Sequence, residues 1–144
     1  MKLPRFNFNF EGIHLVFPLI GVFGIYTVTI FPFSFYRHKW AMQHQMNYNR
    51  ETIHIQQQLE CGLAGLLLFI ILGFLINWFI ALPALFLYWI LYGLFFVMNI
   101  INGYYWRRAN RSICFKREAN QYANIYAYWK IRRPFSWIKY INFE

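Results

Sequence analysis

The residues of this chain that could carry out chemistry gather in one short segment, NRETIHIQQQLEC, at positions 49–61. Residues three, four and seven positions apart share one face of a helix. One such stripe consists of Glu51, His54, Gln58 and Cys61, and Gln57 and Glu60 add a supporting polar cluster. A glutamate three positions before a histidine is a spacing used by metal ligands and acid–base pairs on helices. The stripe also fits a second interpretation, an amphipathic helix start whose polar side chains lie near lipid headgroups.

A further carboxylate that could join this stripe is Glu118, in the segment CFKREANQYAN. The stretch between the two segments is apolar and long enough to fold as a hairpin, which would return Glu118 to the side of Glu51 and His54. Glu118 could then belong to the site, or it could form an ion pair with a nearby arginine such as Arg50. The residues alone leave both possibilities open.

The elements that must position these residues are those of a membrane protein. Of the 144 residues, 59% are hydrophobic and only 13% are charged, whereas soluble domains have about a quarter charged residues. No charged residue lies between Glu60 and Arg107, nor between Glu11 and Arg37. About 20 apolar residues span a bilayer as a helix. We therefore expect an integral membrane protein.

The predicted fold is all-α and forms a single membrane domain over residues 1–144. It begins with an N-terminal membrane segment at 12–36. A transmembrane helical hairpin follows, with helices at 50–78 and 84–104. The chain then continues as a C-terminal amphipathic interfacial helix at 112–131, in which aromatic and basic residues alternate with helical spacing.

The charge distribution predicts location and partners. The net charge is +9, and nine of the fourteen Lys and Arg residues lie between Arg107 and Lys139. Basic residues that flank membrane segments favour the cytoplasmic side, so we expect the chain in the inner (cytoplasmic) membrane with its basic flanks in the cytoplasm. The expected partners are the lipid bilayer and a membrane protein or a further copy of the chain, and no nucleic acid.

Four segments carry a resemblance to a known group of proteins: IFPFSFYRHKW, NRETIHIQQQLE, RSICFKREANQYAN and RRPFSWIKY. They resemble small bacterial membrane proteins similar to gluzincin-type metallopeptidases, whose pattern is HExxH followed by a downstream glutamate. The resemblance covers residues 30–60 and 107–140. It implies that Glu51 is the general base, that His54 is a metal ligand, and that Glu118 is the downstream ligand.

This chain departs from that pattern at two positions. Arg50 stands where the first histidine ligand would be, and Lys116 stands where the first glutamate of the downstream segment would be. Arginine is effectively always protonated, so it has no lone pair to offer a metal. A catalytic zinc keeps three protein ligands and an open position. Only two ligands survive here, unless His44 or Gln57 supplies a third.

Three functions follow from these observations. The first is a catalytically degenerate membrane protein that acts as a scaffold or accessory subunit, in which Arg50 pairs with Glu51 or Glu118 in place of a metal. The second is an active membrane-embedded zinc metallopeptidase. The third is a small transporter or channel subunit, which the absence of charges within the membrane segments disfavours. We expect no cofactor in the chain as written, and zinc if the site is active.

Overall fold

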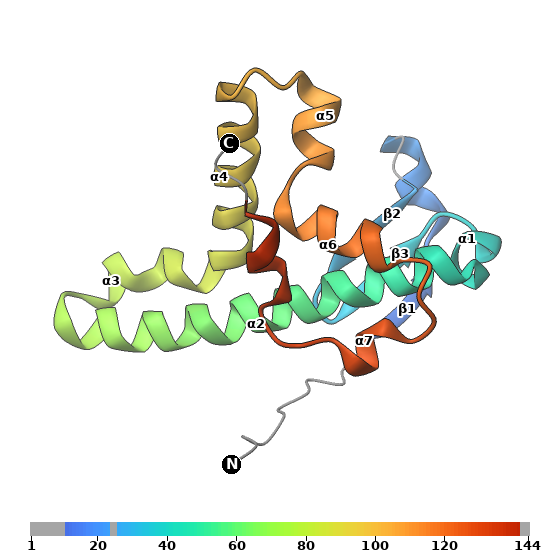
Figure 1. Cartoon of the computed structure of the whole chain (residues 1–144). Helices are drawn as coiled ribbons and strands as arrows, with labels where there is room; N and C mark the ends of the chain where they lie inside the picture. The colour runs from blue at the N-terminus through green and yellow to red at the C-terminus, as the bar shows by residue number, and fades with distance from the viewer. Residues whose placement is uncertain (1–10, 24–25, 142–144) are drawn as a thin grey trace, which may run out of the picture.

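The computed structural model describes residues 11–23 and 26–141. These residues form a polar body, built on a small sheet and several helices, from which an apolar arm extends to the left in Figure 1. One long helix, α2 (Gln45–Leu75), runs through the body and continues into the arm. The short helix α1 (Lys39–Gln43) precedes it.

The N-terminal part of the body is a three-stranded sheet. Its strands are β1 (Ile13–Val16), β2 (Thr27–Ile30) and β3 (Phe33–Tyr36), in the order β1-β3-β2. β3 pairs in parallel with β1 and antiparallel with β2. A 3-10 helix, η1 (Pro18–Phe23), follows β1.

This sheet overturns the predicted membrane segment at 12–36 and with it the all-α fold class. Its described residues form short strands and a 3-10 helix, not a spanning helix. The run Thr27–Ile30 consists entirely of β-branched residues, which favour strands because of their restricted side chains. The alternation in Phe33–Tyr36 places Ser34 and Tyr36 inside and Phe33 outside, as expected for a strand with one covered face.

The two ends of α2 have opposite character. Every residue from Glu51 to Gln58 is buried although most of these side chains are polar. Beyond Cys61, the large apolar side chains are mostly exposed, including Leu67, Phe74 and Leu75. This is the reverse of a helix in a soluble protein, which buries apolar residues and exposes polar ones.

The arm is completed by the chain that follows α2. α3 (Trp78–Ala81) and η2 (Leu82–Phe86) return along the C-terminal half of α2, and α4 (Leu87–Ile101) then turns away from it. Gly65 permits this close packing, because a Cβ atom there would lie 2.2 Å from the carbonyl oxygen of Ala84. The hairpin predicted from helices at 50–78 and 84–104 is thus present in part. Its returning half is not one continuous helix, because the 3-10 helix η2 separates α3 from α4.

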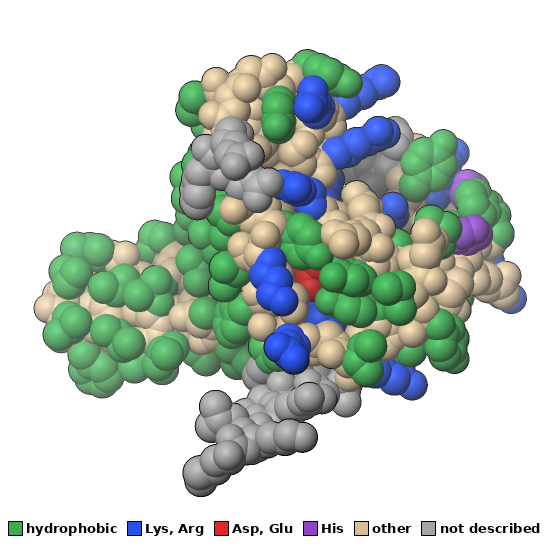
Figure 2. All heavy atoms as spheres, in the orientation of Figure 1, with side chains coloured by type: hydrophobic (Ala, Val, Ile, Leu, Met, Phe, Trp, Pro, Cys, Tyr) green, Lys and Arg blue, Asp and Glu red, His purple; other side chains and the backbone are tan. Residues whose placement is uncertain are grey.

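Two helical stretches, Gln45–Leu75 and Trp78–Ile101, are long and apolar enough to cross a membrane. Within their most apolar windows only 22% and 17% of the residues are buried, whereas the core helix of a soluble protein is mostly buried. Figure 2 shows the arm as a surface of hydrophobic side chains without basic residues, while Lys and Arg side chains gather over the body.

The C-terminal part of the chain packs back onto the body as short helices. They are α5 (Trp106–Arg111), α6 (Cys114–Tyr122), α7 (Tyr128–Ile131) and the 3-10 helix η3 (Ser136–Tyr140). The single interfacial helix predicted at 112–131 is therefore wrong: the chain breaks between α6 and α7, where Ala127 has a positive φ of 51°.

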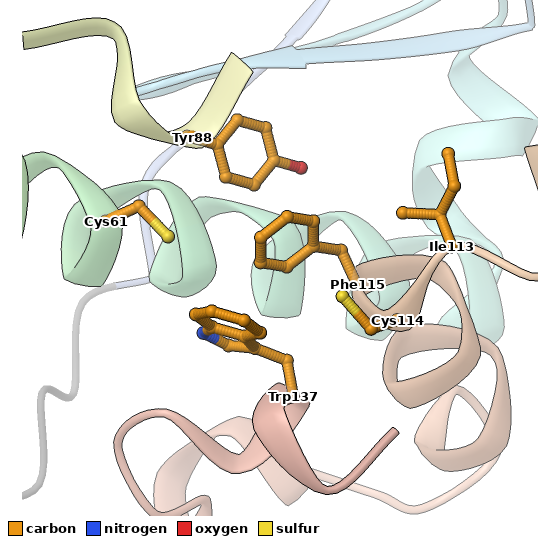
Figure 3. Packing of buried hydrophobic residues seen from close by; sticks show 6 residues of the cluster. All are labelled: Cys61, Tyr88, Ile113, Cys114, Phe115 and Trp137. Atoms are coloured by element: carbon orange, nitrogen blue, oxygen red, sulfur yellow. The ribbon is translucent and has the colours of Figure 1, made fainter. Parts of the chain in front are cut away.

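An aromatic cluster fastens these short helices to α2 and α4. Phe115 of α6 lies between Tyr88 of α4 and Trp137 of η3, with ring centroids 4.8 Å and 4.6 Å away (Figure 3). Cys61 and Cys114 complete the cluster as free, buried thiols. The cluster holds α6 against the polar half of α2, which is where the candidate site lies.

Candidate functional site

The buried amides of α2 bind the backbone of the segments packed around it. Asn49 donates from Nδ2 to the carbonyl oxygens of Ala123 and Ile125, at 2.9 Å and 3.0 Å. Gln58 accepts from the backbone N–H of Phe31 at 2.6 Å and donates to the carbonyl oxygen of Thr29 at 2.8 Å. Buried polar groups are costly unless hydrogen-bonded. These side chains therefore join α2 to the sheet and to the C-terminal part of the chain.

Glu51, the predicted general base, has both of its carboxylate oxygens engaged. Thr27 donates its hydroxyl to Oε1 at 2.9 Å, and Thr29 donates to Oε2 at 2.7 Å. Arg50 donates to Oε1 from Nε at 2.9 Å, and its Nη2 forms a salt bridge with the same oxygen at 2.9 Å. The expectation that Arg50 pairs with Glu51 or Glu118 is thus confirmed for Glu51.

His54, the predicted metal ligand, is held by a relay of hydrogen bonds. Gln57 donates from Nε2 to Glu118 at 2.8 Å and to the carbonyl oxygen of Phe115 at 3.0 Å, so its Oε1 is the acceptor. That oxygen lies 2.8 Å from Nδ1 of His54. The proton of a neutral imidazole must therefore be on Nδ1, which leaves the lone pair on Nε2.

Glu118, the predicted downstream ligand, belongs to a buried ion cluster. Arg132 donates to it from Nε at 2.8 Å and from Nη2 at 2.9 Å, and the same guanidinium binds Glu60. The side chains of all three are at most 2% exposed. Burial works against the charge of Arg132, but its hydrogen bonds with Glu118 and Glu60 outweigh this, so its pKa is raised.

Gln57 thus lies between His54 and Glu118 and is hydrogen-bonded to both. Within the described part of the chain, no three His, Cys, Asp or Glu side chains are placed to hold a metal ion. His44, the other candidate for a third ligand, is exposed at the start of α2 and lines a different pocket.

An open cleft of about 650 Å³ lies beside Arg50, Glu51 and His54. α6 contributes Lys116 to this cleft, whose ammonium group donates to Oδ1 of Asn110 at 2.7 Å. Burial lowers the pKa of Lys116, and the neighbouring Arg50 cation lowers it further. In the pattern that the sequence resembles, the position of Lys116 is a glutamate. This position lines the cleft, whereas that of Glu118 does not.

Sequence reasoning missed three parts of this site. The hydroxyls of Thr27 and Thr29 come from a segment predicted to be a membrane helix, although their i, i+2 spacing is that of one strand face. Arg132 lies just beyond the interfacial helix predicted at 112–131, and no role at the site was expected for it. The sequence holds no signal that distinguishes it from the exposed Arg133 beside it.

No protein-family model matches the chain, and neither a curated protein nor a solved structure is significantly similar to it.

Proposed function

We propose that this chain is a membrane-embedded protein of zincin-like descent that has lost its metal and acts as a scaffold or accessory subunit. The observation that carries the proposal is the salt bridge between Arg50 and Glu51, supported by the two threonine hydroxyls. A general base must have a carboxylate oxygen within reach of the proton it removes. Here that carboxylate is buried and its oxygens are taken up by protein donors.

The positive charges around Glu51 also support the loss of the metal. In the pattern that the sequence resembles, the positions of Arg50 and Lys116 are a histidine and a glutamate. Both now carry cations into the cleft, where they would repel a zinc ion and offer it no lone pair. The remaining parts, His54 with its Gln57 and Glu118 relay, resemble a ligand and its supporting hydrogen bonds.

The apolar arm supports insertion into a bilayer. Most of its large apolar side chains are exposed, and large exposed apolar patches mark membrane or protein interaction surfaces; no charged residue lies between Glu60 and Arg107. Basic residues follow immediately at α5. By the positive-inside rule, the body then lies on the cytoplasmic side of a bacterial inner membrane.

Peptide hydrolysis by native protein and by a Glu51→Gln variant tests the loss of catalysis. Both proteins are incubated with excess zinc and a mixed peptide substrate. We expect no hydrolysis above buffer in either sample, since Glu51 is not available as a base. Hydrolysis by the native chain that disappears in Glu51→Gln would show an active peptidase instead.

A further inference from the structure

The cleft beside Glu51 carries surplus positive charge. Arg50, Arg111 and Lys116 line it, and Glu51 is its only carboxylate among the described residues. Glu51 pairs with Arg50, so it neutralises one of the three cations. No salt bridge within the described residues involves the other two. The cleft therefore has about two positive charges without a protein counter-ion.

The cations of the cleft keep hydrogen-bond donors available. Arg50 binds Glu51 and Thr27 through Nε and Nη2, and Nη1 has no bond among the described residues. Lys116 has three N–H donors, of which one is directed at Asn110, and its ammonium lies 5.6 Å from the ring centroid of Tyr92. An arginine fork beside a lysine is a combination that suits phosphate oxygens.

One wall of the cleft is aromatic and leads to the apolar surface. Tyr88, Trp89 and Tyr92 of α4 form this wall, and Trp89 is about half exposed. The outer face of the same helix carries exposed apolar side chains such as Leu94 and Val97. A molecule with an anionic head and an apolar tail could therefore place its head among the cations and its tail along α4.

We propose that this cleft binds a phosphate monoester through Arg50, Arg111 and Lys116. The charge of such a group at pH 7 is about −1.5 to −2, which matches the surplus of the cleft. The cleft volume of about 650 Å³ lies in the usual range of ligand sites. The phosphate group can belong to a lipid headgroup of the phosphatidate type or to a soluble phosphate, and the aromatic wall favours the lipid.

This inference rests on the proposed function, because a zinc ion in the cleft would bind phosphate by itself. The test uses the full chain in detergent and records thermal unfolding against increasing dioctanoyl phosphatidic acid, dioctanoyl phosphatidylcholine or inorganic phosphate. A ligand of the folded state raises the melting temperature in a saturable way. The cleft variant Arg111→Gln/Lys116→Gln is compared with Arg107→Gln/Lys139→Gln, which removes two exposed cations outside the cleft.

We expect phosphatidic acid to raise the melting temperature of the native protein and phosphatidylcholine to leave it unchanged. The cleft variant should bind phosphatidic acid at least about tenfold more weakly, since charged hydrogen bonds are lost, and the control variant should bind like the native protein. Equal affinity for inorganic phosphate would show that the cleft recognises the phosphate group without a lipid tail and identify a soluble phosphate as the ligand, whereas tighter binding of phosphatidic acid would identify the lipid.

An equal response to both lipids, or equal affinities in the cleft and control variants, would overturn the inference. Zinc content is measured on the same samples. Zinc-free protein that responds to neither phosphatidic acid nor inorganic phosphate would refute the anion site alone. One zinc per native chain would refute the proposed function.

Discussion

Replacing Arg132 with methionine should destabilise the protein strongly. The Arg132 guanidinium is in direct contact with two buried carboxylates, those of Glu60 and Glu118. The methionine side chain replaces most of the apolar stem of the arginine, so the substitution removes the positive charge while it changes the side-chain volume little. Glu118 would retain its bond from Gln57, and Glu60 its bond from the backbone N–H of Phe135, but neither bond supplies a positive charge.

The magnitude follows from the burial of the cluster. Removal of one partner from a buried ion pair costs about 3–5 kcal/mol, and here one guanidinium serves two carboxylates. For a chain of this length about 1 kcal/mol corresponds to about 3 °C in melting temperature. We therefore expect Arg132→Met to melt at least about 10 °C below the native protein in detergent at pH 7, as followed by circular dichroism.

The adjacent Arg133 provides the matched control, since it is exposed and an exposed substitution typically changes stability by about 0.5 kcal/mol or less. Adding Glu60→Gln and Glu118→Gln to Arg132→Met should recover part of the loss, because the uncompensated charges are then removed. If Arg132→Met and Arg133→Met melt within about 2 °C of each other, the ion cluster does not stabilise the fold as described.

Three smaller effects are also expected. Arg50→Ala should lower stability by about 1–2 kcal/mol by thermal unfolding, because Glu51 keeps its threonine bonds and Arg50 is a third exposed; an unchanged melting temperature would contradict this. Burial raises the pKa of the Cys114 thiol to about 12, so maleimide labelling at pH 8, resolved by mass spectrometry, should require unfolding. Because the unfolded thiol ionises first, Cys114 should also weaken stability as pH rises above about 9. Cysteines introduced at Gln45 and Arg107 should label from the same side of a bilayer, and labelling from opposite sides would refute the shared cytoplasmic body.

The features predictable from the sequence were the ones that composition alone determines. The charge-free stretch after Glu60 predicts exposed apolar helices; the candidate span Trp78–Ile101 lies wholly within it, and the span Gln45–Leu75 ends in it. Composition could not separate a membrane helix from strands at 12–36, since both are apolar. The β-branched run Thr27–Ile30 and the alternation at Phe33–Tyr36 were the available signals.

Helical spacing predicts which residues of α2 share a face, but it does not predict the contacts that they make. Glu51, His54, Gln57 and Gln58 do lie together, because helical spacing on α2 fixes their relative positions. The role of Glu118 depends on α6 and on Arg132, which are brought to α2 by aromatic packing around Phe115. Such tertiary contacts have no local signature in a single sequence.

The central claim is that side-chain cations have replaced a metal in the cleft, and zinc content measures this directly. Arg50→His/Lys116→Glu would place an imidazole at position 50, four residues before His54 on the same helix, opposite a carboxylate of α6. The two imidazoles and the carboxylate give three ligands and an open position. Arg50→His alone gives fewer metal ligands, because Glu118 is held by its salt bridge with Arg132. By plasma mass spectrometry of protein purified without chelator, we expect far less than one zinc per native chain and about one in the double variant. One zinc per native chain would contradict the account.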